Sequence, residues 1–478
     1  MERWIVLILG IASLLQIMFL PGLLVLLLTG TSGGVVRTTL VSFALSMVIN
    51  FYLTAVLVSL GQFTSSSMYL IFAAEMLSLI FLARVELNRP LPALINAVRA
   101  RFREHKNLIT CRYTKVESAL ALLSLATLEL FLYNYLSGLG SIFDHGDDVI
   151  SWNRWAVDWY KGYFPRMTWN YPQLLPANWS ISYVFLNESR LQFFAKSICP
   201  VFSLFMVLAL YDLWVRKRDF SYLCAIPVTA ALCMALTGGS MNKGYADVPV
   251  AFMAFMSVYV LLAAGDGEVS DNNKSIVIGS ICCAGAALTK QAGLYVVGIY
   301  PLLCYLLVKG SFRNAGSFGK ALKIASIYLL LFVLTAPWYL YTASKIAAGR
   351  EDSEIRYVTH DIYLGRSIWG RLIDFGAKIK VNMDALLGSW SLQHMSGFAF
   401  VAVIACLAVI CALLVYFTLQ SLHDTLCRYL VALLVVPYFC LWIKYFSYDF
   451  RNLTLVFPFI GLVVGNGMYR RIKACQSV

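Results

Sequence analysis

Long apolar stretches recur along the whole chain, and they constrain its fold more than any other feature of the sequence. A helix of roughly 17–25 mainly apolar residues can cross the hydrocarbon core of a bilayer. We place such stretches at residues 4–28, 38–61, 67–84, 116–139, 196–215, 220–238, 247–264, 275–289, 292–308, 322–343, 397–417, 428–446 and 453–469. The 478-residue chain is 60% hydrophobic and 13% charged, more apolar than a soluble core of this size requires. The sequence therefore predicts an all-α polytopic membrane protein with about thirteen transmembrane helices.

The net charge of +13 does not indicate nucleic-acid binding, because the basic residues are scattered between apolar stretches instead of covering one soluble face. Segments 85–115, 216–218, 309–323 and 470–473 are the richest in lysine and arginine, which predicts that they are cytoplasmic. An odd number of spans then places the N-terminus outside and the C-terminus in the cytoplasm. The predicted outer segments are 140–195, 239–246, 290–291, 344–396 and 447–452.

The 12 cysteines do not resemble a disulfide framework or a metal site. Most of them lie inside apolar stretches, where cysteine behaves as a small hydrophobic residue. The chain has no CxxC pair and no Cys/His spacing typical of zinc. Function must therefore be sought among the polar residues of the outer segments.

Two adjacent carboxylates, Asp147 and Asp148, stand out in the first large outer loop. Helical spacing places Asp148 on one face with Trp152, Trp155 and Trp159. Tryptophan-rich amphipathic helices are typical of the membrane interface, so we expect an interfacial helix here. Capping of the helix N-terminus is the ordinary role of such a carboxylate, and it explains one aspartate better than two.

The next two outer turns also carry charge. Asp247 opens a predicted span just after Lys243 and Tyr245, either as a helix cap or as a second acid for the same cavity. Lys290 interrupts an apolar stretch in a very short turn, where an ionisable residue is costly and usually functional. Snorkelling of its ammonium group to the interface is the ordinary alternative.

Further polar residues lie in the remaining outer segments. Arg451, between the last two spans, can bind phosphate oxygens with its guanidinium group or pair with Asp449. Tyr171 lies in the run 169–176, which contains two prolines and is predicted to be extended and not helical. The loop 344–396 carries charges of both signs that the sequence alone does not rank.

Four short motifs occur in one order and on one predicted side of the membrane. They are Asp147-Asp148-Val149-Ile150-Ser151-Trp152-Asn153-Arg154-Trp155-Ala156, Gly244 to Asp247, Leu288-Thr289-Lys290 and Pro337-Trp338-Tyr339. With them, residues 116–470 resemble the GT-C superfamily of polyprenyl-phosphate-sugar-dependent glycosyltransferases. The likeness is to the bacterial aminoarabinose–lipid A transferases and rhizobial lipopolysaccharide sugar transferases, and more distantly to protein mannosyltransferases. Three spans precede this core here, whereas the family's large outer loop usually follows the first span.

The resemblance implies that a sugar on a polyprenyl phosphate is transferred, with inversion, to a hydroxyl group of a glycan, lipid or protein acceptor. It implies an aspartate general base, for which helical phase favours Asp148 over Asp147, since Asp148 shares the tryptophan face. Asp247 would orient the acceptor, or hold a divalent cation such as Mg²⁺ or Mn²⁺ together with Asp148. No other cofactor is implied.

The same resemblance suggests roles for residues around these carboxylates. Positive side chains would bind the donor phosphate and offset the charge of the leaving group; these are Lys290, Lys243, Arg451 and Arg154. Aromatic side chains would contact the sugar or the acceptor; these are Trp152, Trp155, Tyr171 and Tyr245.

We expect four units: extra N-terminal spans with a basic cytoplasmic loop (1–115), a GT-C-like core (116–345), a second outer loop (346–396) and C-terminal spans (397–478). The resemblance suggests a bacterial inner membrane with the site on the periplasmic face, although an endoplasmic-reticulum location stays open. Two alternatives remain. One is a transporter or flippase of a lipid-linked or anionic substrate. The other is an O-antigen polymerase or ligase, which would leave the Asp147-Asp148 pair unexplained.

Overall fold

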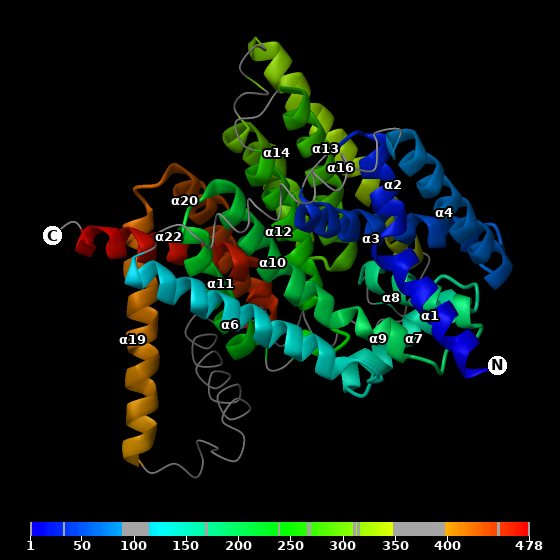
Figure 1. Cartoon of the computed structure of the whole chain (residues 1–478), viewed down its shortest axis with the longest axis horizontal. Helices are drawn as coiled ribbons and strands as arrows, with labels where there is room; N and C mark the ends of the chain where they lie inside the picture. The colour runs from blue at the N-terminus through cyan, green and yellow to red at the C-terminus, as the bar shows by residue number, and fades with distance from the viewer. Residues whose placement is uncertain are drawn as a thin grey trace.

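The structure is a computed structural model in which all elements of the described residues are helices. It describes residues 2–31, 34–87, 114–166, 168, 171–237, 240–264, 269–308, 312, 316–347, 397–446 and 450–476. The loop 344–396 therefore lies almost wholly outside the described residues, as does most of the basic segment 85–115. Figure 1 shows the helices packed side by side, with α6 along one flank, α4 at the far end and α19 standing at the edge.

Each predicted span coincides with helical structure. The N-terminal helices are α1 (Arg3–Met18), α2 (Leu20–Leu28), α3 (Val35–Ser59) and α4 (Ser65–Leu87). The central helices are α6 (Lys115–Gly138), η1 (Asp148–Asn153), α7 (Arg154–Tyr160), α8 (Leu174–Leu186), α9 (Phe193–Ser197), α10 (Cys199–Lys217), α11 (Ser221–Leu236), η2 (Ser240–Asn242), α12 (Asp247–Ala264), α13 (Val269–Thr289), α14 (Gly293–Leu307) and α16 (Ser317–Ala347). The C-terminal helices are α19 (Gly397–Ser421), α20 (Thr425–Leu430), η4 (Val431–Val435), α21 (Val436–Leu441), η5 (Trp442–Phe446), η6 (Phe450–Val456) and α22 (Phe457–Gln476).

The membrane class predicted from the sequence is supported, but the count of about thirteen spans is not confirmed. Among the described residues, 8 helices are long and apolar enough to cross a bilayer, or up to 9 if the bent pair α1–α2 is one span. Several of the other predicted spans form shorter helices, among them α11 and α14. Apolar composition alone cannot separate a short helix buried in protein from a membrane span.

The clearest difference from the sequence prediction is α8. The run before it was expected to be extended, yet Leu174, Leu175 and Pro176 form the first turn of this helix. Proline is tolerated there because the first backbone N–H groups of a helix have no intrahelical partner. Every residue of α8 is buried, and the helix packs against α1, α3 and α7. The first outer loop therefore contributes a core helix.

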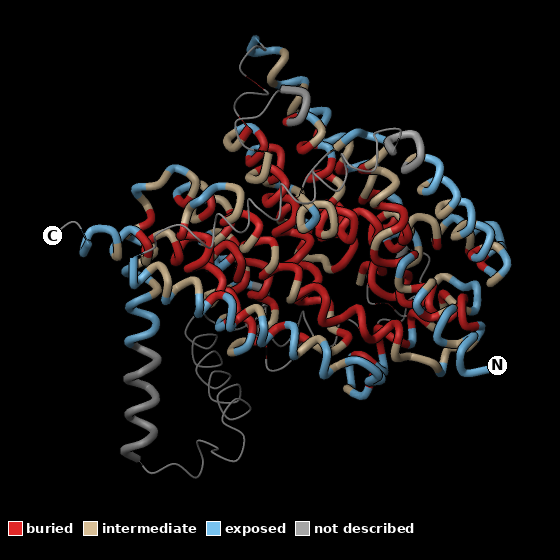
Figure 2. Tube along the Cα trace, in the orientation of Figure 1, coloured by how far each residue is buried: buried red, intermediate tan, exposed pale blue. Residues whose placement is uncertain are grey.

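The central helices are buried and the outlying helices are exposed. Figure 2 shows the buried residues concentrated in the centre of the molecule, around α8, α10 and α12, whereas α4 and the described part of α19 are mostly exposed. The exposed side chains of α4 include Leu70, Leu77 and Phe81, as expected for a helix that faces lipid. The central helices are thus enclosed by protein, and the outlying ones are exposed along most of their length.

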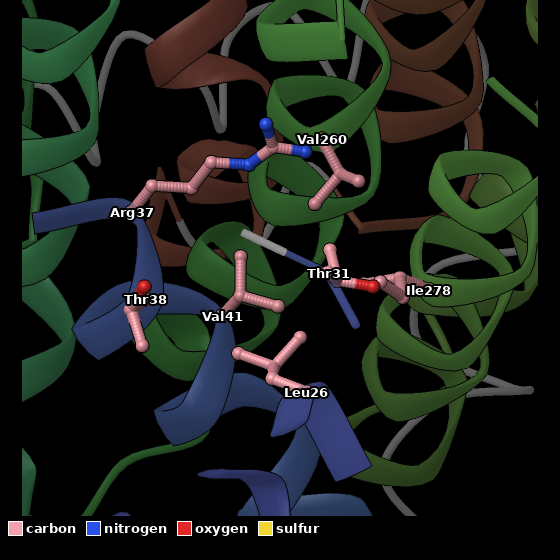
Figure 3. Close-up of a pocket in the computed structure, with 7 residues that line it drawn as sticks. All are labelled: Leu26, Thr31, Arg37, Thr38, Val41, Val260 and Ile278. Atoms are coloured by element: carbon pink, nitrogen blue, oxygen red, sulfur yellow. The ribbon is translucent and has the colours of Figure 1, made fainter. Parts of the chain in front are cut away.

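The two ends of α12 carry separate polar clusters. Near its C-terminal end, the hydroxyl of Tyr259 donates to Asp212 at 2.6 Å, and the Arg216 guanidinium donates to the same carboxylate at 2.5 Å. A cavity of about 10 Å³, enough for one water molecule, lies at this end between α2, α3, α12 and α13 (Figure 3). Its lining residues are Leu26, Thr31, Arg37, Thr38, Val41, Val260 and Ile278. The candidate site lies at the other end, around Asp247.

Candidate functional site

Asp148 is completely buried and joins three segments of the chain. Its Oδ1 atom accepts the backbone N–H of His145 at 2.7 Å, three residues earlier, whereas Asp147, at the N-cap position, makes no capping hydrogen bond. Its Oδ2 atom does something further. It accepts the ammonium of Lys196 at 3.1 Å and the backbone N–H of Gly244 at 3.3 Å. The carboxylate therefore holds the first outer loop against α9 and against the turn before α12.

Gly244 is required by this close approach. A Cβ atom at this position would lie 2.8 Å from the Cβ of Asp148 and 2.8 Å from the Phe143 ring. We expect Gly244→Ala to separate the two loops and to destabilise the protein by about 1–3 kcal/mol, the usual cost of overpacking. Thermal unfolding in detergent measures this effect. Gly298→Ala is the matched control, because a Cβ atom in that helix meets nothing within 4 Å; equal stability of the two variants would contradict the steric argument.

The second acid, Asp247, forms an ion pair with Lys290. The Lys290 ammonium lies 2.5 Å from Asp247 Oδ1 and donates a second hydrogen bond of 2.7 Å to the side chain of Asn452. Both charged side chains are largely buried, with 15% of Lys290 and 7% of Asp247 exposed. Snorkelling does not describe this lysine, because it bridges the starts of α12 and η6. The tight turn that positions it depends on Gly293, whose Cβ would clash with the backbone of Ala286 at 2.2 Å.

Asp147 faces a different environment from its neighbour. Its carboxylate is 61% exposed and lies 3.6 Å from the guanidinium of Arg451, which is 30% exposed. The same guanidinium lies 4.6 Å from the centre of the Tyr245 ring, a cation–π contact. Burial, together with the nearby Asp147 carboxylate, raises the pKa of Tyr245, so its hydroxyl stays neutral at physiological pH.

These contacts make one continuous group. Arg451 contacts Asp147 and Tyr245. It also lies close enough to Asp247 for an electrostatic interaction with that carboxylate. Segments from loop 140–147, η1, α9, the turn before α12, the α13–α14 turn and η6 therefore meet at one end of the bundle. The sequence predicted only that most of them share a side.

Interfacial anchoring by Trp152, Trp155 and Trp159 is not confirmed, because protein buries all three side chains. Trp152 and Trp155 are 6% and 1% exposed, and they contact each other and Tyr171 with ring centroids 5.1–6.2 Å apart. Trp159 is also buried, against Phe164. Asp148 is buried like these tryptophans, but residues 148–153 form a π-helix, so the regular helical phase used to predict a shared face does not hold there. Protein covers the tryptophans because α7 packs on α8. Only Tyr171 and Tyr245, both half-buried, remain accessible among the four predicted aromatic contacts.

Two predicted phosphate-binding residues are not brought into the group. Arg154 is exposed, and its charge acts on Asp158, one turn further along α7. Lys243 is half-buried beside Gly244, and among the described residues no ion pair joins it to the site. The positive charges that do enter the group are Lys196, Lys290 and Arg451.

Lys196 is the residue that sequence reasoning missed. It is 4% exposed and sits between Asp148 and Asp144, 3.1 Å and 3.9 Å away, above the ring of Phe143. In the sequence it marks only the edge of a span, where lysine is common. Asp144 and its neighbour His145 were also missed; a hydrogen bond of 2.8 Å from the His145 ring lowers the pKa of Asp144. A lone lysine beside an aromatic pair was the only available signal.

The acids do not fit a divalent cation held by Asp148 and Asp247. Each carboxylate already has a lysine ammonium at 2.5–3.1 Å, and a metal bound to that carboxylate would meet this positive charge. Asp144, His145 and Asp148 offer ligand atoms within 4.8 Å of one another, yet the Lys196 ammonium lies against this cluster too. The charge of each buried acid is balanced by the protein itself, so we derive no step through a metal.

Comparison with protein-family models, with curated proteins and with solved structures finds no match to this chain. Its function must therefore be argued from the site itself.

Proposed function

We propose that this protein is an integral membrane glycosyltransferase that moves a sugar from a polyprenyl-phosphate donor to a hydroxyl acceptor. The observation that supports it best is the convergence of Asp147, Tyr245 and Arg451 at one end of a helical bundle, beside the Asp247–Lys290 pair. A partly exposed carboxylate next to a partly exposed guanidinium supplies a proton acceptor and a phosphate ligand within one small area. Three of the four motifs that resemble GT-C enzymes contribute residues to this area, namely Asp147-Asp148, Gly244 to Asp247, and Lys290.

Arg451 is the cation best suited to contact the donor phosphate. It is the most exposed of the three at the site, at 30% against 15% for Lys290 and 4% for Lys196. Its planar guanidinium can donate two hydrogen bonds to phosphate oxygens. Lys290 donates to the side chain of Asn452, the next residue in the chain, and adds positive charge to the region where the leaving phosphate gains its charge.

Asp147 is the carboxylate best suited to act as the general base. In the transfer, the acceptor hydroxyl loses its proton to a carboxylate, its oxygen bonds to the anomeric carbon, and the bond from that carbon to the phosphate oxygen breaks. Asp148 has hydrogen-bond donors on both oxygens and no exposed surface. We therefore propose that Asp147, and not the neighbour favoured by helical phase, takes the proton, while Asp148 positions the loop that carries it.

The membrane supplies the remaining geometry of the proposal. The polyprenyl tail would lie among the lipid-facing helices and its phosphate at the end of the bundle that bears Arg451. The resemblance to bacterial enzymes suggests the periplasmic face of an inner membrane, with a glycan, lipid or protein as the acceptor.

The test is a transfer assay in proteoliposomes with a radiolabelled polyprenyl-phosphate sugar. We expect the wild-type protein to consume the donor, and Arg451→Ala to raise the KM for the donor by about tenfold to 100-fold, the loss of one charge-assisted hydrogen bond or a bidentate pair. Arg451→Lys should recover part of the loss. Lys161→Ala, an exposed charge at the end of α7, is the control and should behave as wild type. Uptake of intact donor into sealed vesicles without transfer would instead identify a transporter.

A further inference from the structure

A carboxyl group lies in the middle of an otherwise apolar span and takes no part in the candidate site. Glu75 is the only acidic or basic residue between Ser65 and Leu82 of α4, the part that qualifies as a membrane span. Ionisable side chains at this depth are rare, because the bilayer core does not solvate charge, and they usually have a function. Its surroundings therefore matter more than its position in the sequence.

Glu75 contacts a buried polar cluster at the point where the first span is broken. The side chain of Gln16, which is 0% exposed, donates a hydrogen bond to the Glu75 carboxyl group. The Gln16 amide donates to Asn50 Oδ1 at 3.2 Å, and Asn50 donates to the backbone carbonyls of Gln16 and Ile17 at 3.0 and 3.3 Å. These carbonyls lie just before the 43° bend between α1 and α2. Irregular backbone at membrane depth is tolerated where it is buried in protein, and discontinuous helices often flank ion sites.

Two acceptor oxygens in this cluster lack a donor. Both Glu75 Oε2 and Gln16 Oε1 are buried and have no hydrogen-bond partner. An ionised glutamate offers acceptors only, so it can satisfy neither atom, whereas a protonated one carries an O–H that can donate to the glutamine oxygen. The unpaired acceptors are the pattern expected when one proton belongs between them.

No positive charge compensates this carboxyl group among the described residues of the elements around it. In α1, α2, α3, α4 and α8 the only basic residues with described side chains are Arg3 and Arg37. Arg3 is 13 residues before Gln16 in α1, and Arg37 is 13 residues before Asn50 in α3. Thirteen residues span about 20 Å along a helix. The other titratable side chains of these helices donate their hydroxyls elsewhere; they are Tyr52 to Leu334, Tyr69 to Phe185 and Tyr183 to Asn153.

We infer that Glu75, Gln16 and Asn50 form an intramembrane proton-binding site in which Glu75 is protonated at neutral pH and donates to Gln16 Oε1. The bound ligand is H⁺. The site fixes α4 against the broken span, and loss of the proton would leave an unpaired carboxylate in the apolar core. Proton binding here is independent of sugar transfer at the end of the bundle, so either can fail without the other.

A hydrophobic carbodiimide tests the protonation state directly. The carboxylic acid adds across the carbodiimide: its proton moves to one nitrogen, its oxygen bonds to the central carbon, and the acyl group then migrates to nitrogen as a stable N-acylurea. At about pH 7, where a solvated glutamate with a pKa of about 4.3 is ionised, we expect labelling of the Glu75 peptide by mass spectrometry. The Glu117 peptide is the control, because that carboxylate accepts hydrogen bonds from Thr114 and Tyr469 and should remain unlabelled.

Infrared spectroscopy and stability measurements identify the partner. The difference spectrum of wild type minus Glu75→Gln should contain the carbonyl stretch of a hydrogen-bonded carboxylic acid, and Gln16→Leu should shift it to the frequency of a free acid. Glu75→Gln, which mimics the protonated form, should melt as wild type does, whereas Glu75→Ala should melt lower. Carboxylate bands in place of the acid band, or labelling of Glu75 only in acid, would overturn the proposal.

Discussion

Asp147→Asn is expected to lose about 10²- to 10⁴-fold in kcat/KM for transfer of the sugar, the usual contribution of a general base. Asparagine has nearly the same shape but cannot accept the hydroxyl proton. The Asp147 side chain is 61% exposed and 3.6 Å from Arg451, so the substitution removes a partly solvated charge and should leave folding unchanged. The measurement is initial-rate transfer in proteoliposomes, with thermal unfolding recorded on the same preparations.

Asp158→Asn is the matched control for this experiment, since Asp158 lies in the same outer segment but interacts with Arg154, Lys161 and Arg166. It should transfer sugar at the wild-type rate. Asp148→Asn should lower activity and stability together, because Asp148 holds the first outer loop, which carries Asp147, against α9 and the turn before α12. If Asp147→Asn transfers sugar normally and Asp148→Asn loses transfer with unchanged stability, the base is Asp148. Normal rates in both variants would remove the aspartate-base mechanism altogether.

Lys196→Met is expected to be the most destabilising single substitution at the site, by about 3–5 kcal/mol, because it leaves a fully buried carboxylate without its counter-charge. Asp148 is 0% exposed, and its two remaining donors are the backbone N–H groups of His145 and Gly244. Asp148→Asn should cost less. The amide oxygen of the new asparagine can still accept the N–H of His145. Lys196 in turn retains its ion pair with Asp144, at 3.9 Å, and its contact with the Phe143 ring.

The double variant separates a buried ion pair from simple loss of packing. Lys196→Met with Asp148→Asn removes both charges, so we expect it to recover most of the stability lost by Lys196→Met alone. Chemical or thermal unfolding of all four proteins in one detergent completes the cycle. Additive losses in the double variant would contradict a direct interaction between the two side chains.

The sequence selected segments that meet in the folded protein, but it assigned the wrong surroundings to some of them. Asp147-Asp148, Asp247, Lys290 and Arg451 were selected because charges beside apolar stretches need a reason, and they do meet in the folded protein. The tryptophans of the first loop were expected at the membrane interface, yet they are buried against protein. An amphipathic pattern shows that one face is apolar, and it does not show whether lipid or protein covers that face.

Lys196 and α8 show why the remainder escaped prediction. Lysine at a span edge is ordinary, and only the approach of a loop 48 residues earlier in the chain turns Lys196 into the partner of Asp148. Prolines stand just before α8 and in its first turn, at Pro172 and Pro176, and the helix is stabilised by burial on all sides. Most helical stability comes from such packing and little from local propensity.

By itself, the sequence determined that this protein is helical and membrane-embedded. The hydrophobicity and length of each stretch are local properties, and they decide whether that stretch can cross a bilayer as a helix. The tertiary structure decided which charges pair, which of two adjacent aspartates is accessible and which face of the first loop is covered. Those outcomes depend on contacts between residues far apart in the chain, and the free energy of a buried charge is set by its neighbours in space.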